Sequence, residues 1–270
     1  MTSFAIKLLV GIGATYLLIV ALLFVFQQSF IYPAPQQRAP LTPGYEEVVL
    51  ETEDGLELRA IYREADPGLP TVLYFHGNGG SIAGASVSNA AVVEAGIGAL
   101  LVEYRGYGGN PGEPSEEGLY RDGEAAADWL LAQGVRERDI VVVGNSIGAG
   151  VATHIASRLE AGEEVPAGLV LIAPFTSLPD IAAEKLWWVP ARILVRGHYD
   201  NMLRVRQLAI PMLIQHGDAD RIIPDTHGKA LAAAGGAAFQ PFAGSGHALS
   251  FERRSSEARR DWILALDRQK

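Results

Sequence analysis

The chain has 270 residues, of which 49% are hydrophobic and 20% charged, and it carries a net charge of −9. This composition is typical of a folded protein with a large core and is too apolar for a disordered chain. The acidic balance and the lack of a basic block argue against binding to a nucleic-acid backbone. The absence of cysteine excludes disulfides, cysteine-ligated metals and thiol catalysis.

The first 30 residues predict a transmembrane anchor. Residues 8–26 are an uncharged, mainly apolar run, which as a helix would be about 28 Å long, close to a bilayer core. The alternatives are a buried core helix and a cleaved signal peptide, although no small-residue cleavage site precedes Pro33. Lys7 and the terminal amine favour a cytoplasmic N-terminus, which would place residues 31–270 on the non-cytoplasmic side.

Residues 31–45 predict a linker between this anchor and the rest of the chain. Four prolines lie between residues 33 and 43, a content that favours an extended, unpaired backbone. We therefore expect a Pro-rich tether that lifts the domain of residues 46–270 off the membrane.

Residues 46–270 predict an α/β domain. Residues 46–53 and 56–63 flank an Asp-Gly turn and indicate an antiparallel hairpin. Five further runs have the Val, Leu and Ile content of strands buried on both faces of a parallel sheet. These runs are residues 71–77, 98–106, 139–146, 168–175 and 211–218. Helical periodicity is found at residues 81–95, 115–133, 148–161, 226–234 and 255–266. The alternation indicates a mostly parallel, doubly wound sheet.

Residues 176–208 interrupt the alternation of strands and helices. They contain the apolar sequence LWWVP at residues 186–190. One interpretation is a small cap, inserted after the preceding strand, whose side chains line a substrate groove. The other is an ordinary crossover helix with two tryptophans in the core. The sequence supports the two about equally.

Ser146 lies in a G-x-S-x-G motif between a predicted strand and a predicted helix. This is the setting of a nucleophile elbow, in which a strained turn exposes a serine at the sheet edge. A serine nucleophile needs a base and an orienting acid, which in this fold follow it in that chain order: serine, acid, histidine. Asp218 and Asp220 follow the last clear strand, and His247 lies in a turn of small residues. We expect His247 to take the proton from Ser146 and Asp220 to orient the imidazole.

A Gly-rich loop, HGNGG at residues 76–80, follows another predicted strand. It does not fit a dinucleotide site, which would need glycine where Ile82 stands, and it lacks the lysine of a phosphate-binding loop. In a hydrolase, this loop and the residue after the nucleophile supply the two amides of the oxyanion hole. The backbone N–H groups of Asn78 and Ile147 are therefore our candidates. The sequence shows no metal motif, and the chemistry requires no cofactor.

Taken together, these motifs resemble those of α/β-hydrolases of the N-terminally membrane-anchored ABHD and bud-emergence type, also described as serine aminopeptidase-like. The segments that carry the resemblance are residues 76–80, 103–126, 144–150, 216–224 and 244–247. The resemblance implies catalytic roles for Ser146, Asp220 and His247. Asp220 is preferred to Asp218 because it fills the last place of H-G-x-x-D. Asn78 matches the oxyanion position.

One departure from the family bears on the substrate. Asn145 precedes the serine, where many relatives have a basic residue, so a preference for anionic headgroups is not transferred. At the end of a predicted strand, Arg105 is expected to form a structural ion pair with Glu116 or Asp122.

The sequence therefore predicts a membrane-anchored serine hydrolase that cleaves carboxylic esters or thioesters, with acyl lipids as candidate substrates. One alternative is an amidase or peptidase with the same triad, in which Glu116 or Glu117 would bind an ammonium group. The other is a membrane-tethered scaffold without turnover.

Overall fold

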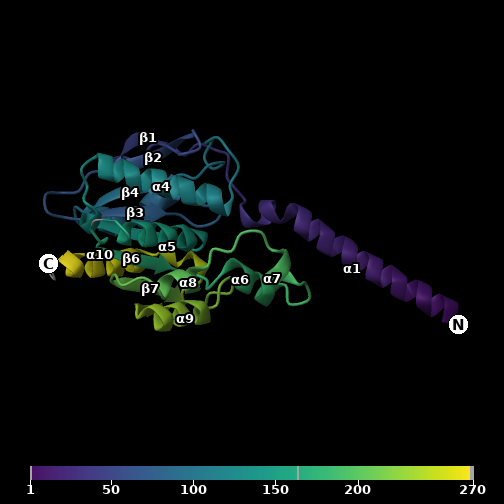
Figure 1. Cartoon of the computed structure of the whole chain (residues 1–270). Coiled ribbons are helices and arrows are strands. Elements are labelled where there is room, and N and C mark those ends of the chain that lie inside the picture. Colours follow the sequence, from purple (N-terminus) through teal and green to yellow (C-terminus); the bar gives the residue numbers. More distant parts are fainter. Residues whose placement is uncertain (1, 163, 268–270) are drawn as a thin grey trace.

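The computed structural model describes residues 2–162 and 164–267, and its centre is one eight-stranded sheet (Figure 1). The strand order is β1-β2-β4-β3-β5-β6-β7-β8. β1 and β2 pair antiparallel, as do β2 and β4, and every other neighbouring pair is parallel. The strands are β1 (Glu46–Glu51), β2 (Glu57–Arg63), β3 (Thr71–Phe75), β4 (Gly98–Val102), β5 (Ile140–Asn145), β6 (Gly168–Ile172), β7 (Met212–Gly217) and β8 (Ala238–Phe242). The expected hairpin and mostly parallel sheet are confirmed.

Helices cover both faces of the sheet, so the domain has three layers. One core contains side chains of α4, α5, α8 and α9, and the other contains side chains of α2, α3 and α10. The helices of the domain are α2 (Ile82–Ser88), α3 (Ala90–Glu94), α4 (Glu116–Ala132), α5 (Ile147–Glu160), α6 (Leu178–Lys185), α7 (Ala191–Leu194), α8 (Asn201–Val205), α9 (Asp225–Gly235) and α10 (Arg253–Asp267). Two short 3₁₀ turns cover Glu137–Asp139 and His247–Phe251.

Two details of the sheet and its helices differ from expectation. The helix expected at residues 81–95 is two helices, because Asn89 is fully buried and its side chain bonds to the carbonyl of Ala85. The last strand, β8, is not among the strands predicted from the sequence. All but the last of its residues are partly or fully exposed at the edge of the sheet, and it lacks the continuous apolar run of the inner strands.

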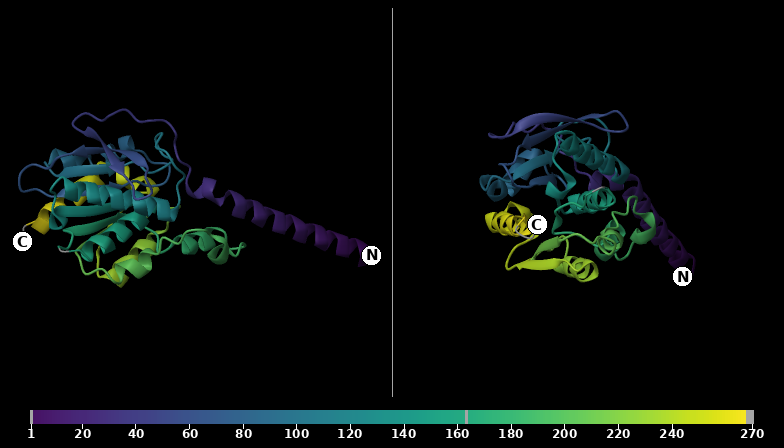
Figure 2. Two further views of the ribbon diagram at one scale, coloured as in Figure 1. Left: turned by 45° about the horizontal axis from the view of Figure 1, so that its top comes forward. Right: turned by 60° about the vertical axis from the view of Figure 1, so that its left-hand side comes forward.

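Helix α1 (Thr2–Ile31) extends away from the domain (Figures 1 and 2). It continues past the end of the apolar run at Phe26, and its segment Ser3–Ile31 is long and apolar enough to cross a membrane. None of the apolar window is buried within the structure, which excludes a core helix of the domain.

The first residues of the Pro-rich segment lie against the domain. The hydroxyl of Tyr32 is 2.8 Å from that of Tyr199, and both side chains are buried. The amide of Gly108 donates to the carbonyl of Pro35, and the side chain of Gln36 donates to the carbonyl of Gly106. This part of the segment is therefore a fixed joint, where the sequence suggested a free spacer.

Residues 176–208 form a small cap that contains α6, α7 and α8. Trp187 is 83% exposed and Trp188 is 39% exposed. The two tryptophans are therefore not in the core, as the crossover interpretation required; that the cap lines a substrate groove stays a prediction. In Figure 1, α6 and α7 lie on the side of the domain from which α1 leaves.

Candidate active site

Ser146 occupies a strained turn between β5 and α5. Its φ of 53° and ψ of −117° lie in a region that residues with a side chain rarely adopt. A Cβ on Gly144 would lie 2.3 Å from the carbonyl oxygen of Gly148, and a Cβ on Gly148 would lie 2.3 Å from that of Phe75. Both positions of the motif therefore require glycine, and their close packing holds the serine in its strained conformation.

His247 and Asp220 reach Ser146 from two other loops. The Oγ of Ser146 is 3.0 Å from Nε2 of His247, and Nδ1 of His247 is 2.8 Å from Oδ2 of Asp220. Asp220 follows β7, and His247 begins the 3₁₀ turn after β8. All three side chains therefore come from the carboxyl ends of parallel strands, which meet at one edge of the sheet.

The environment of Asp220 favours its ionised form. Burial raises the pKa of this carboxyl, but the nearby imidazoles of His216 and His247 and the amide of Ile223 outweigh the burial, so that the pKa lies below its usual range. Oδ1 accepts hydrogen bonds from the amides of Ile222 and Ile223 at 2.8 and 2.9 Å. The remaining oxygen, Oδ2, is the one that faces His247, so the imidazole is held in one orientation.

Asp218, the other candidate acid, has a different position. Its Oδ1 accepts a hydrogen bond from the amide of Gly244, 2.7 Å away. Asp218 therefore holds the loop that carries His247 in place. Its hydrogen bond goes to the backbone of that loop and not to the imidazole.

The Gly-rich loop forms the facing wall of the site. A Cβ on Gly77 would lie 3.3 Å from the Cβ of Ser146, so the loop passes directly over the serine. A cleft of about 260 Å³ is lined by residues of this loop and of the three catalytic candidates' loops, among them Asn78, Ser146, Ile222 and His247. Ile147 is the first residue of α5 and directly follows the serine. Asn78 lines the same cleft as Ser146, and Ile147 adjoins the serine in the chain, so both stay candidates for the two oxyanion donors.

Glu103 is a residue of this region that sequence reasoning missed. It is fully buried after β4, accepts a hydrogen bond from the amide of Ile82, and lies 3.1 Å from Nε2 of His76. His76 also contacts the rings of Tyr104 and Tyr107. Glu103 and His76 therefore join the Gly-rich loop to β4. The YRGYG sequence that follows Glu103 indicates a tight turn, but it does not indicate that His76 is the partner of Glu103.

Arg105 pairs with Asp122, one of its two expected partners, and not with Glu116. Its Nε donates to Asp122 at 2.7 Å, and its terminal nitrogens donate to both oxygens of Asp54, which the sequence did not suggest. Glu116 instead accepts hydrogen bonds from the amides of His198 and Tyr199 in the cap. The guanidinium of Arg105 therefore joins the turn of the first hairpin to α4, away from the serine.

Three other histidines have partners that explain their positions without a catalytic role. His154 bonds to Glu124, His227 bonds to Glu184, and His216 contacts the carbonyl of Ile223. Among residues 2–162 and 164–267, no group of three or more His, Asp or Glu side chains is arranged to hold a metal ion.

The arrangement has the parts required for acyl transfer. It brings together a hydroxyl, an imidazole within hydrogen-bond distance, a carboxylate on the far nitrogen and a loop that passes over the hydroxyl. This set can activate a serine toward a carbonyl carbon and hold the charge that develops on the carbonyl oxygen.

Comparisons with known proteins agree with the fold. The profile of a family described as "alpha/beta hydrolase fold" matches residues 72–221. An uncharacterized protein of Mycobacterium tuberculosis is 38% identical over 77% of this chain and 75% of its own. The lysophosphatidylserine lipase ABHD12 of Xenopus tropicalis is 29% identical over 68% of this chain and 51% of its own. The crystal structure of an alpha-beta hydrolase from Vibrio vulnificus superposes with a TM-score of 0.76 at 25% identity, and the match covers 89% of this chain and 92% of that one.

Proposed function

Since the chain belongs to the α/β-hydrolase family, in the branch that includes ABHD12 and the protein bem46 of Schizosaccharomyces pombe, we propose that it is a membrane-anchored serine hydrolase that cleaves carboxylic esters or thioesters. The observation that carries the proposal is the line of contacts from Ser146 through His247 to Asp220. Helix α1 supplies the anchor, because it is long and apolar enough to cross a bilayer.

The reaction proceeds through an acyl-enzyme. His247 accepts the proton of the Ser146 hydroxyl while Oγ attacks the carbonyl carbon, and the imidazolium is stabilised by Asp220. The oxyanion is held by the backbone N–H groups of Asn78 and Ile147. When the intermediate collapses, the proton passes from His247 to the departing alcohol or thiol. Water, deprotonated by His247, then releases the acid and restores Ser146.

Lipid esters are the substrates that the surroundings of the cleft favour. The chain enters the domain directly from α1, and Pro33 lies near Gly79 of the loop beside Ser146. The cap presents apolar side chains, including the exposed Trp187. Asn145, next to the serine, is neutral and gives no reason to require an anionic headgroup.

The amidase alternative has less support. Glu116, which was a candidate for binding an ammonium group, is already occupied by two amides of the cap and by the hydroxyl of Tyr120. An acidic side chain with three donors around it has little capacity left for a substrate amine.

The test is labelling of the detergent-solubilised full chain with a fluorophosphonate. We expect wild type to be labelled and Ser146→Ala to be unlabelled. Ser157→Ala, a change in α5 eleven residues after Ser146 at a serine whose hydroxyl bonds to the carbonyl of Thr153, should be labelled normally. Asp220→Asn should lower kcat by about 10⁴-fold, since the imidazole loses its orientation. Equal labelling of wild type and Ser146→Ala would reject the serine assignment, and no labelling of either would favour the scaffold.

A further inference from the structure

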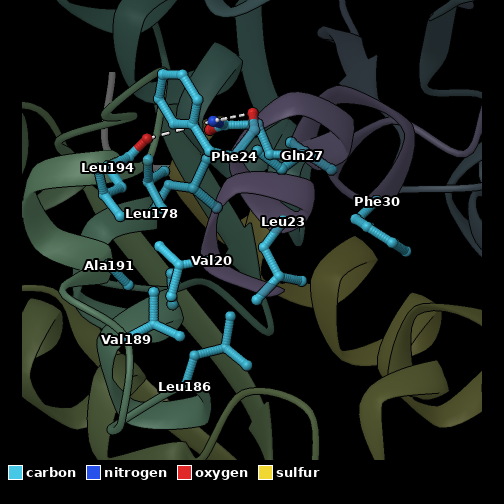
Figure 3. Close-up of a pocket in the computed structure, with 13 residues that line it drawn as sticks. Val20, Leu23, Phe24, Gln27, Phe30, Leu178, Leu186, Val189, Ala191 and Leu194 are labelled. Carbon is cyan, nitrogen blue, oxygen red and sulfur yellow. Dashed lines mark hydrogen bonds between the residues drawn. The ribbon is translucent and has the colours of Figure 1, made fainter. Parts of the chain in front are cut away.

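A second cavity, of about 310 Å³, lies between α1 and the cap, apart from the cleft at Ser146 (Figure 3). We call it the α1–cap cavity. Its walls come from two segments only: Val20, Leu23, Phe24, Gln27, Phe30 and Ile31 of α1, and Leu178, Ala182, Leu186, Val189, Ala191, Leu194 and Val195 of the cap. Figure 3 shows side chains of both segments converging on the same space. The volume is within the range of small-ligand sites, about 300–1,000 Å³.

The one polar side chain in these walls is fully engaged. Gln27 is 8% exposed, its amide nitrogen donates to the carbonyls of Phe24 and Leu194, and its amide oxygen accepts from the N–H of Arg196. These bonds fasten α1 to the cap and leave no polar group of Gln27 for a ligand. The cavity therefore offers only apolar contacts, which suit a hydrocarbon chain and no charged or hydrogen-bonding ligand.

The cavity lies along the part of α1 that would be in the membrane. The ring of Trp188 contacts that of Tyr16, whose hydroxyl donates to the Trp188 carbonyl. The cap thus follows α1 from Ile31 back to Tyr16, about 22 Å along the helix axis. Tyr16 and Ile31 both belong to the segment Ser3–Ile31, which is long and apolar enough to span a bilayer. Trp187 and Ile193 of the cap are 83% and 84% exposed, as expected of side chains that face lipid.

The segments that line the cavity also contact, beyond its edge, residues that line the Ser146 cleft or adjoin them. On the α1 side, Ile31 lines the cavity, and a Cβ on Gly79 of the cleft would lie 3.9 Å from the carbonyl of Pro33. On the cap side, Leu186 lines the cavity, and the ammonium of its neighbour Lys185 donates to the carbonyl of Arg221. Ile222, the next residue, lines the cleft. The cavity and the cleft have different lining residues, but they are linked by these two contacts.

From these observations we infer that the α1–cap cavity binds the acyl chain of a membrane lipid ester whose carbonyl is presented to Ser146. Helix α1 is then one wall of the substrate site as well as an anchor, and the lipid enters laterally from the bilayer. This inference rests on the proposed function for the fate of the ester, but binding of the chain does not require turnover.

The first experiment measures binding without catalysis. Full-length Ser146→Ala in phosphatidylcholine vesicles is photolysed with a lysophospholipid that carries a diazirine in its palmitoyl chain, and the adducts are mapped by mass spectrometry. We expect adducts at residues 20–31 and 178–195. Adding Ala182→Phe, which fills the cavity, should lower them several-fold. Adding Ala183→Phe, on the neighbouring half-buried alanine that lines a different surface depression beside Asp180, should not. Adducts spread only over residues 3–15, or equal adducts in both Phe variants, would overturn the inference.

The source of the chain is settled by competition. Excess unlabelled lysophospholipid should displace the probe more strongly than free palmitic acid does, because the proposed ligand is an ester. Stronger displacement by palmitic acid would show a fatty-acid site and overturn the assignment to substrate.

The second experiment uses chains with Ser146 intact and compares p-nitrophenyl palmitate with p-nitrophenyl acetate. Ala182→Phe should lower the palmitate-to-acetate ratio of kcat/KM by about tenfold or more, since losing the burial of two methylene groups already costs that much. Ala183→Phe is the control. An equal ratio in the two variants contradicts the inference. A wild-type protein that is not labelled by the fluorophosphonate would instead reject the proposed function. The crosslinking result would still test binding of the acyl chain, because it does not require turnover.

Discussion

At the scale of single residues, the site depends on where side chains are absent. Only glycine fits at positions 144 and 148 of the elbow, because a Cβ on Gly144 or on Gly148 would lie 2.3 Å from a backbone oxygen. The positions of Ser146, Asp220 and His247 followed from motif and chain order, and the structure brings the three side chains together. Glu103 could not be predicted, because its partner His76 is distant in sequence and only the fold makes them neighbours.

Gly148→Ala is expected to destabilise the protein and to lower its activity. The new methyl group would force α5 away from the end of β3, at a cost of about 1–3 kcal/mol, and would move Ser146 relative to the Gly-rich loop of residues 76–80. Thermal unfolding in detergent and fluorophosphonate labelling measure the two effects. Gly13→Ala on α1, where a Cβ meets nothing within 4 Å, is the control and should change neither. A Gly148→Ala protein with normal stability and labelling would contradict this account of the motif.

The decrease in folding stability at acidic pH should depend on Asp220. Because the folded-state pKa of this carboxyl lies below the ordinary aspartate value of about 3.9, the unfolded chain takes up a proton first as the pH falls. The stability that ionised Asp220 contributes is therefore complete above about pH 4 and is lost below it. The Tm difference between wild type and Asp220→Asn should be constant from pH 7 to pH 5 and shrink below pH 4. A difference that grows on acidification would show the opposite sign of the pKa shift.

At the scale of elements, long-range contacts fix how neighbouring segments lie. The sequence left the cap unresolved because aromatic and aliphatic residues serve equally in a core and in a substrate groove. The contact between Tyr16 and Trp188 spans 172 residues, and no local pattern announces it. Arg105 is similar: it joins the first hairpin, β4 and α4 through Asp54 and Asp122, and of these two partners only Asp122 was considered from the sequence.

Removing only one partner of the Arg105–Asp122 pair should destabilise the protein. Both side chains are buried, so Asp122→Leu leaves a guanidinium with a lost partner and should destabilise the protein by about 3 kcal/mol. Arg105→Met combined with Asp122→Leu removes both charges and should restore part of the loss, because Asp54 is one-third exposed and can be solvated by water. Urea unfolding measures the three proteins. A double variant less stable than Asp122→Leu would contradict the structural role of the pair, and a change in KM alone would indicate a substrate contact instead.

At the scale of the whole molecule, the alternation of apolar runs and helical stretches was enough to predict the architecture. Continuous Val, Leu and Ile content marks the inner strands, whereas the edge strand β8 carries a weaker signal because one side of it is exposed. The sequence also predicted the span, but not that the joint after it is fixed to the domain, since Tyr32 and Tyr199 meet only in the folded chain.

The side of the membrane on which the domain lies is an expectation that a cysteine-free chain makes easy to test. Lys7 at the N-terminal end of α1 favours a cytoplasmic N-terminus. Glu113→Cys, at an exposed position of the domain, should therefore react with an impermeant maleimide in intact cells, and Ser3→Cys only after permeabilisation. The reverse pattern would place the domain in the cytoplasm.

The bonds of Gln27 divide α1 into two parts with different evolutionary freedom. Residues 3–15 are exposed and need mainly apolar length and the charge of Lys7, so another hydrophobic sequence that keeps this lysine should replace them. Residues 20–32 fit against the cap and are held to it by Gln27 and Tyr32, so a change there must be matched by a change in the cap. A chimaera that takes the whole span from an unrelated membrane protein would still be anchored in the membrane but would lose the α1 surface that the cap contacts. A chimaera that takes only residues 3–15 would keep the anchor and that surface.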